Sequence, residues 1–268
     1  MVERLTSPAN PTLKRIRSLR EKKFRRAEGQ FLAEGLRIVA EAVEAGIVPE
    51  VLVFGDEYEH HPLVERLVAT TEQAGGSAIA TSRDMLHKLT EKDNPQAVVG
   101  VFRQRTTPLA ALDRSVAATW VVCQSLKDPG NLGTILRTGD AVGAGGVVLL
   151  DDSCDPFSVE AVRASMGALF TQTLVQTDGP SFFNWLRNGP GMLVGASLES
   201  ARDYQAVRYA APTFVMMGNE QSGLPATYAA QCDVLVKLPM LGKADSLNVA
   251  VATAVLLYEV LNQRRHAR

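Results

Sequence analysis

The sequence contains few of the residues that build metal-bound or disulfide-linked sites. Its 268 residues include three cysteines, which lie far apart and lack the Cys-x-x-Cys or Cys/His spacing of a zinc site: Cys123, Cys154 and Cys232. We therefore expect reduced, mostly buried thiols and no metal ion. The four histidines form no cluster, and we interpret each as a surface residue: His60, His61, His87 and His266.

Long hydrophobic runs are also absent. No apolar stretch approaches the roughly 18 residues that a membrane span needs, and the chain starts without the apolar core of a signal peptide. Hydrophobic residues make up 46% and charged residues 21% of the chain, as in ordinary globular proteins. We therefore expect a cytoplasmic protein that binds no membrane, with about two domains of roughly 150 residues each.

The overall charge is close to zero, but it is unevenly distributed. Residues 1–26 contain nine Lys or Arg against two Glu, a net charge of +7, so the rest of the chain carries about −8. Basic runs of this kind are often only the solvated side of a helix, but this density favours contact with phosphates. We predict RNA contacts from Lys14, Arg15, Arg17, Arg20, Lys22, Lys23, Arg25 and Arg26.

The first part of the chain alternates between strands and helices. After a basic helix that buries Leu13, Ile16 and Leu19, we expect strands near 31–33, 50–54, 77–80 and 96–103, with helices near 36–45, 61–74 and 82–89. This order predicts a small, mostly parallel layered α/β domain. The polar segment 103–113 is the candidate linker, so we assign residues 1–108 and 109–268 to two domains.

The second part continues the alternation. We expect strands near 119–124, 146–150, 173–176, 192–197, 212–217 and 234–238, and helices near 131–142, 158–166, 181–187 and 246–263. The glycines at 139, 143, 145 and 146 close the first of these helices. The dinucleotide fingerprint Gly-x-Gly-x-x-Gly opens a helix instead, so a nicotinamide dehydrogenase is disfavoured.

Three polar loops follow apolar runs in this second part. In an α/β protein, loops at the carboxyl ends of strands line the ligand crevice. Read singly, the polar residues have structural explanations: Asn131 and Ser246 as helix N-caps, Arg137 as a solvated helix residue, and Glu220 as a carboxylate near a helix start.

Together, the three loops resemble the motifs of the SpoU/TrmH family of RNA ribose 2′-O-methyltransferases. Asp128-Pro-Gly-Asn131-Leu-Gly-Thr-Ile-Leu-Arg137-Thr is similar to the first motif, and Gly218-Asn-Glu220-Gln-Ser-Gly-Leu-Pro225 to the second. Leu238-Pro-Met240 followed by Ser246-Leu-Asn248 is similar to the third, with Ala250 in place of a common Ser. Phe31-Leu-Ala-Glu-Gly-Leu-Arg37 and the basic helix resemble the family's ribosomal-protein-like substrate-binding domain.

The resemblance implies a fold, a cofactor and an assembly. The fold is the α/β knot, in which the C-terminal segment forms a deep trefoil knot, preceded by the smaller α/β domain. The cofactor is S-adenosylmethionine, which the knot loops bind, and two subunits pair there as a homodimer. The resemblance implies cofactor contacts from Gly218, Leu238, Met240, Leu247, Ser197 and Gly242.

The implied reaction is methylation of a ribose 2′-OH in structured RNA, with rRNA expected before tRNA because of the separate N-terminal domain. The catalytic residues that the resemblance implies are Asn131, Arg137, Glu220, Ser246 and Asn248. An Arg guanidinium keeps its proton at accessible pH, so we interpret Arg137 as a cationic clamp on phosphate rather than a base. The alternatives are a tRNA methyltransferase, or a non-catalytic RNA-binding or ribosome-assembly protein of the same fold.

Overall fold

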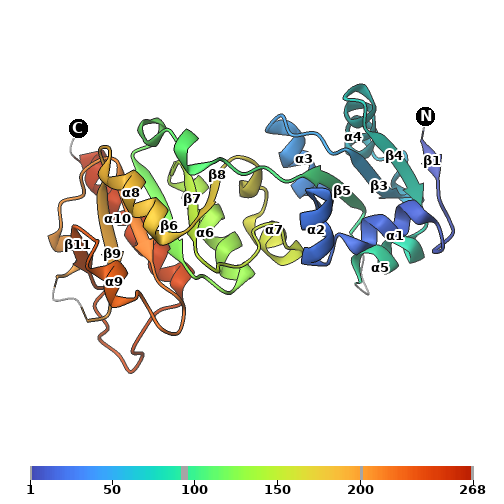
Figure 1. Ribbon diagram of the computed structural model, residues 1–268. Helices are drawn as coiled ribbons and strands as arrows, with labels where there is room; N and C mark the ends of the chain where they lie inside the picture. The colour runs from blue at the N-terminus through green and yellow to red at the C-terminus, as the bar shows by residue number, and fades with distance from the viewer. Residues whose placement is uncertain (1, 92–95, 200–201, 267–268) are drawn as a thin grey trace. The chain divides into compact units, whose positions relative to one another are not determined.

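The computed structural model describes residues 2–91, 96–199 and 202–266 (Figure 1). Contacts divide the chain into two compact units: Met1–Gln104 with Asp155–Thr171, and Arg105–Cys154 with Gln172–Arg268. The domain border that we placed between residues 108 and 109 stays a prediction. The contacts, however, put Asp155–Thr171, which we assigned to the second domain, into the first unit.

An aromatic cluster holds this returning segment within the first unit. Phe157 lies 5.0 Å from Phe31 and Phe170 lies 4.9 Å from Phe102, measured between ring centroids. Helix α7 (Val159–Ser165) packs on strand β2 (Gln30–Glu34). A nearly buried ion pair joins Arg25 to Asp155 at 2.7 Å. Aromatic burial and this pairing explain why the segment joins the first unit.

The first unit is built around a five-stranded sheet in the order β1-β4-β3-β5-β2. Besides β2, its strands are β1 (Glu3–Arg4), β3 (Val51–Gly55), β4 (Ser77–Thr81) and β5 (Val98–Arg103), and its helices are α1 (Pro11–Ser18), α2 (Lys22–Glu28), α3 (Leu36–Glu44), α4 (Pro62–Gln73) and α5 (Arg83–Thr90). Apart from the basic helix, the expected strands and helices are confirmed.

The expectation of a mostly parallel sheet is wrong for this unit. Strand β5 runs antiparallel to both β3 and β2, whereas the β1–β4 and β3–β4 pairs are parallel. The chain enters β5 at the carboxyl end of β3, where Val98 pairs with Phe54. Alternation of helices and strands gives their order along the chain, but it leaves open at which end of the sheet a strand begins.

The basic segment forms two short helices instead of one. Asn10 caps α1 through its side-chain oxygen, which accepts hydrogen bonds from the backbone N–H of Thr12 and Leu13, and Pro11 occupies the first turn. The buried residues Leu13, Ile16 and Leu19 anchor this part of the chain to the core, as expected. Helix α2 then ends at Gly29, whose φ of 64° suits glycine.

The second unit contains a six-stranded parallel sheet in the order β11-β9-β10-β6-β7-β8. Its strands are β6 (Thr119–Gln124), β7 (Gly146–Leu150), β8 (Thr173–Thr177), β9 (Met192–Ala196), β10 (Thr213–Met217) and β11 (Val234–Val236), and its helices are α6 (Pro129–Ala141), α8 (Gly179–Arg187), α9 (Ala226–Ala229) and α10 (Val249–His266). Trp120, Phe182 and Phe214 are fully buried and pack together within this core.

The strand order reverses between β6 and β10. From β6 the chain moves through β7 to β8 on one side, whereas β10, β9 and β11 lie on the other. In open parallel sheets, the crevice at the carboxyl ends of strands beside such a reversal is the usual ligand site. The three polar loops singled out in the sequence all start near this edge, after β6, β10 and β11.

Candidate active site

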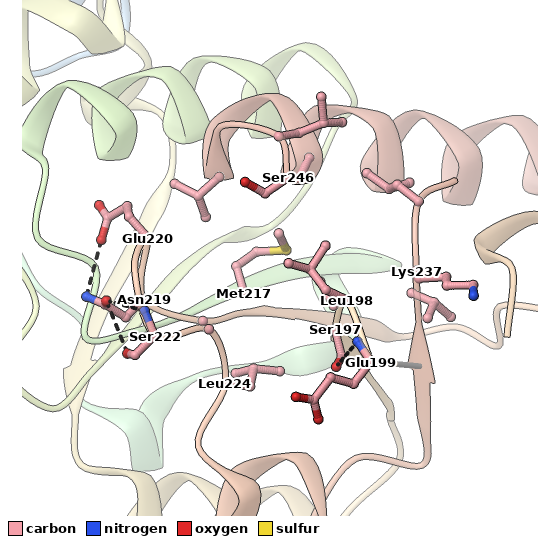
Figure 2. A pocket seen from close by; sticks show the side chains of 18 of the residues that line it. Ser197, Leu198, Glu199, Met217, Asn219, Glu220, Ser222, Leu224, Lys237 and Ser246 are labelled. Carbon is pink, nitrogen blue, oxygen red and sulfur yellow. Dashed lines mark hydrogen bonds between the residues drawn. The ribbon is translucent and has the colours of Figure 1, made fainter. Parts of the chain in front are cut away.

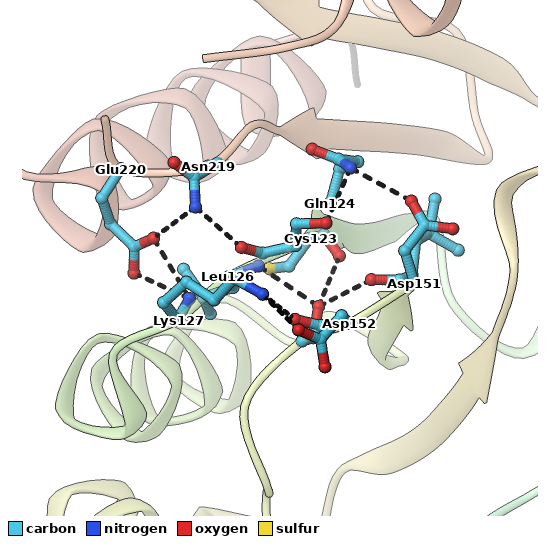
Figure 3. Close-up of polar contacts among 11 residues, drawn as sticks. Cys123, Gln124, Leu126, Lys127, Asp151, Asp152, Asn219 and Glu220 are labelled. Carbon is cyan, nitrogen blue, oxygen red and sulfur yellow. Dashed lines mark hydrogen bonds and ion pairs between the residues drawn. The ribbon is translucent and has the colours of Figure 1, made fainter. Parts of the chain in front are cut away.

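The carboxylate of Glu220 joins the loop after β10 to the loop after β6 (Figure 3). It accepts a hydrogen bond from the backbone N–H of Lys127 at 3.1 Å. It also accepts from the backbone N–H of Asp128 at 2.9 Å and from the Asn131 side-chain amide at 3.4 Å. Burial acts to raise the pKa of Glu220, but the hydrogen bonds outweigh it and hold the pKa below its ordinary value. Glu220 is therefore ionised at neutral pH and holds the loop after β10 against the loop after β6.

The same network continues to the third loop. The side-chain oxygen of Asn131 accepts a hydrogen bond of 2.9 Å from the amide of Asn248. The oxygen of Asn248 accepts in turn from the backbone N–H of Ala250 at 2.9 Å, at the start of α10. One residue from each of the three loops, Asn131, Glu220 and Asn248, thus belongs to a single hydrogen-bonded chain.

Two capping assignments made from the sequence are wrong. Helix α6 is capped by Asp128, whose side chain accepts from the backbone N–H of Asn131 at 2.8 Å. Asn131 lies inside the first turn, and this leaves its side chain available for Glu220 and Asn248. The side chain that caps α10 is Asn248, because that helix starts at Val249, and Ser246 instead hydrogen-bonds to Asp245.

The loop after β10 is closed tightly around its glycines. Asn219 and Gly223 exchange backbone hydrogen bonds of 3.0 and 3.1 Å, and the Asn219 side chain reaches Ser125 O at 2.9 Å. A Cβ added to Gly218 would lie 2.2 Å from the carbonyl carbon of Gly223. Only glycine fits there, since this contact is with backbone that cannot rotate away.

A pocket of about 390 Å³ opens beside this loop (Figure 2). Of the six predicted cofactor residues, five line it: Gly218, Leu238, Met240, Leu247 and Ser197. Gly242 does not line it and is exposed. The walls combine apolar side chains with polar ones that the sequence reasoning missed, among them Glu199 and Asn219. Glu199 follows the carboxyl end of β9, and this position could have identified it from the sequence as a residue of the site.

A second pocket of about 840 Å³ shares the Glu220 loop with the first pocket. Asn131, Glu220, Ser246 and Asn248 all line it, so the structure brings together four of the five predicted catalytic residues. Lys127 and Asp128, which the sequence reasoning did not select, line it as well. Both lie in the short segment 125–128 between the buried strand β6 and the start of α6, and this position could have identified them.

Arg137 lies apart from these four. It is exposed on α6, six residues beyond Asn131, and it lines neither pocket. Helix α6 packs against α10, whose exposed face includes Val251 and Tyr258.

The basic residues of the first unit divide into two groups. Four form ion pairs within the unit: Arg15 with Glu28, Arg17 with Glu91, Arg20 with Glu34, and Arg25 with Asp155. Lys14, Lys22, Lys23 and Arg26 are exposed, and of these only Lys23 has an ion-pair partner among the residues that the structure describes, the exposed Glu21. Arg25 is 3% exposed and holds the returning segment, so its guanidinium is not presented to solvent.

Neither a membrane-spanning helix nor a metal-binding group is found in the described parts of the chain, residues 2–91, 96–199 and 202–266. Within them, no helix is long and apolar enough to cross a membrane. No group of three or more His, Cys, Asp or Glu side chains is arranged to hold a metal ion there.

Comparisons with known proteins give the family. Residues 118–258 match the SpoU rRNA Methylase family, and residues 10–100 match the MRM3-like substrate binding domain. The 23S rRNA (guanosine(2553)-2′-O)-methyltransferase RlmP of Bacillus subtilis is 31% identical over 97% of this chain and 99% of its own. The 23S rRNA (uridine(2479)-2′-O)-methyltransferase of Streptomyces viridochromogenes is 32% identical over 90% of this chain and 85% of its own.

Solved structures agree. An rRNA methyltransferase from Sinorhizobium meliloti with bound AdoMet (S-adenosylmethionine) superposes with a TM-score of 0.91 and 39% identity, covering 100% of this chain and 99% of its own. The SpoU methyltransferase AviRb from Streptomyces viridochromogenes, in complex with the cofactor AdoMet, gives 0.86 and 29%, covering 97% and 100%. The expected α/β-knot fold, methyltransferase class and S-adenosylmethionine cofactor are confirmed, and the chain belongs to the SpoU rRNA methylase family.

Proposed function

We propose that this chain transfers a methyl group from S-adenosylmethionine to a ribose 2′-OH of 23S rRNA. The observation that carries the proposal is the hydrogen-bonded chain Asn248–Asn131–Glu220, which joins the three family loops between the two pockets. The named relatives support rRNA as the acceptor, since RlmP and the Streptomyces viridochromogenes enzyme both carry 23S rRNA in their names. We place the reaction in the cytoplasm, where rRNA is modified.

The smaller pocket fits the cofactor. Its volume of about 390 Å³ lies in the range of small-molecule sites. Apolar side chains of Met217, Leu238 and Leu247 suit an adenine ring, and Gly218 lets backbone approach a ligand closely. When bound, S-adenosylmethionine supplies an activated methyl group.

The larger pocket receives the acceptor ribose. Asn131, Ser246 and Asn248 line it with side chains that both donate and accept hydrogen bonds, which suits ribose hydroxyls. The Glu220 carboxylate accepts hydrogen bonds from backbone and amide donors, so its role is to fix the positions of the loops relative to one another. Orientation of the 2′-OH by these groups lowers the barrier through proximity.

Arg137 acts in a homodimer. It lines neither pocket of its own subunit, yet α6 lies against α10, where Val251 and Tyr258 are 49% and 52% exposed. Pairing of this face with a second copy buries these side chains, and Arg137 then reaches the partner's acceptor pocket. There its guanidinium clamps a phosphate and stabilises developing alkoxide charge.

Exposed cations of the first unit bind the surrounding RNA. Lys14, Lys22, Lys23 and Arg26 are exposed and provide the phosphate contacts. Arg15, Arg17 and Arg20 are paired with carboxylates and contribute less. Arg25 is withdrawn from the RNA surface because it is buried.

The proposal is tested by methyl transfer from labelled S-adenosylmethionine to unmodified 23S rRNA and, separately, to total tRNA, followed by nucleoside analysis. We expect label in a 2′-O-methylated nucleoside of 23S rRNA only. Label confined to tRNA would change the substrate class. Absence of label from both pools, together with measurable cofactor binding by calorimetry, would contradict the proposal.

A further inference from the structure

Lys127 has a firmly held backbone and a charged side chain, and the proposed reaction assigns a role to neither. Its backbone N–H is fixed by Glu220 at 3.1 and 3.2 Å, so the residue is held at the wall of the acceptor pocket (Figure 3). Its side chain points to the neighbouring loop, where Nζ donates to Asp152 O at 2.6 Å and pairs with the Asp152 carboxylate at 2.7 Å. The backbone is anchored, whereas the ammonium group is held only by a surface loop.

Lys127 also brings a positive charge to the acceptor pocket within one subunit. Among the described residues lining the acceptor pocket, it is the single Lys or Arg. The two acids there are committed elsewhere, Asp128 to the cap of α6 and Glu220 to its backbone and amide donors. A ribose 2′-OH lies next to its own 3′-phosphate, so an RNA segment in this pocket brings negative charge close to both acids.

The ion pair that holds Lys127 is exchangeable. The Lys127 side chain is 52% exposed and that of Asp152 is 90% exposed. Pairs between such exposed groups contribute little to stability, and phosphate is a better partner for an ammonium group because it offers several anionic oxygens. Exchange of Asp152 for phosphate therefore costs little.

We propose that Lys127 contacts the phosphate beside the target ribose, and that Asp152 holds its ammonium group until RNA arrives. This inference rests on the proposed methyl transfer to RNA. Lys127 contacts substrate at the backbone phosphate, and Asp152 acts as its competitor. Removal of the lysine charge and removal of the aspartate charge should then shift RNA affinity in opposite directions.

The test compares Lys127→Ala, Lys127→Arg and Asp152→Asn with the wild-type chain, in steady-state methylation of unmodified 23S rRNA at several salt concentrations. We expect Lys127→Ala to raise KM for RNA about tenfold and to flatten the dependence of log KM on log salt by about 0.7–0.9. Lys127→Arg should retain most of the affinity. Asp152→Asn should lower KM, and lower it less in the Lys127→Ala background.

Arg187→Ala is the matched control. Arg187 is an exposed cation at the end of α8, and the chain goes from there to the start of β9, away from the carboxyl ends that form the site. Because Glu220 binds the backbone of residue 127, Lys127→Ala keeps the loop, and its affinity for S-adenosylmethionine should be unchanged in calorimetry. A weakened cofactor affinity would show a structural role for the side chain and overturn the inference.

Two outcomes separate this inference from the proposed function. An active wild-type chain whose KM and salt slope are the same in Lys127→Ala leaves methyl transfer standing and refutes the phosphate contact. A wild-type chain that binds S-adenosylmethionine but methylates no RNA refutes the proposed function, and the role of Lys127 falls with it.

Discussion

At the residue scale, Asn131 is the central member of the active-site network, because it bonds to both other loops. Asn131→Ala removes the bonds to Glu220 and Asn248, and Asn131→Asp also places a carboxylate where the amide lies 3.4 Å from Glu220. Like charges repel, so Asn131→Asp should be the more damaging change. We expect kcat to fall about 10- to 100-fold in Asn131→Ala, the rate equivalent of ~1.4–2.7 kcal/mol, and further in Asn131→Asp.

Single-turnover rates at saturating S-adenosylmethionine measure this effect. Thr134→Asp is the matched control, since Thr134 is an exposed residue of the same helix that lines neither pocket and gains the same charge. Equal rates for Asn131→Asp and Asn131→Ala would contradict the contact between residues 131 and 220 in the working enzyme.

Glu220 gives a prediction about pH. Its pKa in the folded chain lies below the ordinary value of 4.5, since hydrogen bonds from Asp128, Lys127 and Asn131 outweigh the effect of burial. A depressed carboxyl pKa stabilises the fold above 4.5, and this stabilisation is lost as the pH falls through the lowered pKa. We expect the difference in Tm between pH 7 and pH 4 to be smaller in Glu220→Gln than in wild type.

Thermal unfolding followed by circular dichroism at a series of pH values checks this prediction. Asp140→Asn serves as the control, because it removes one exposed carboxylate near the end of α6, outside the three loops. An identical pH profile in Glu220→Gln and wild type would show that this carboxylate does not hold the loops.

At the element scale, the turn after β10 is determined by close backbone contact. A Cβ at residue 218 would lie 2.4 Å from the backbone nitrogen of Leu224, whereas a Cβ at Gly242 would meet nothing within 4 Å. Gly218→Ala must therefore displace the loop that lines both pockets. We expect it to weaken S-adenosylmethionine binding at least about tenfold, the equivalent of ~1.4 kcal/mol.

Isothermal titration of both alanine variants measures this difference. Gly242→Ala should bind the cofactor with nearly wild-type affinity, because its methyl group has open space and Gly242 lines neither pocket. A large loss in Gly242→Ala would restore the cofactor contact that the family resemblance implied for this residue.

Helix α2 carries the element-scale prediction for RNA binding. Lys22 and Arg26 are exposed and lie one turn apart. Lys22→Gln/Arg26→Gln should weaken RNA binding and reduce the slope of log Kd against log salt by about 1.4–1.8, if each residue neutralises one phosphate. Arg37→Gln/Arg66→Gln is the charge-matched control, on helices α3 and α4. Equal slopes in the two variants would remove α2 from the RNA surface.

At the scale of the whole molecule, the proposed homodimer makes the site depend on two copies. Helix α10 is apolar on more than the side it buries, because Val251 and Tyr258 remain about half exposed while Leu256, Leu257 and Val260 are buried. Val251→Glu/Tyr258→Glu should give monomers without methyl transfer. Asn262→Glu, at an exposed polar position of the same helix, should stay dimeric, and sedimentation velocity distinguishes the two.

Mixed dimers extend this prediction to Arg137. Arg137→Ala and Gly218→Leu should each be inactive alone, the first through lost phosphate clamping and the second through a blocked cofactor pocket. If Arg137 serves the partner's site, co-expression should restore up to about a quarter of wild-type activity, because half of randomly paired dimers then have one complete site. Recovery of no activity would place Arg137 in the site of its own subunit.

The sequence by itself determined the order of elements, the family and the loops that line the two pockets. Apolar periodicity located the expected strands and helices because burial of one side imposes a spacing on each element. The motifs in the three polar loops indicated Asn131, Glu220, Ser246 and Asn248 as site residues, and all four line one pocket. These features could be read from the sequence because each depends on residues close together in the chain or on an intact motif.

The features that depend on contacts between residues far apart in the chain were decided by the tertiary structure alone. The antiparallel direction of β5, the return of Asp155–Thr171 to the first unit and the burial of Arg25 against Asp155 all follow from contacts between remote segments. Two further features have the same origin. They are the pairing of Arg15, Arg17 and Arg20 with carboxylates, and the position of Lys127 between Glu220 and Asp152. Local spacing records which side of an element is apolar, but the partner of a charge is chosen by the packing that brings the two together.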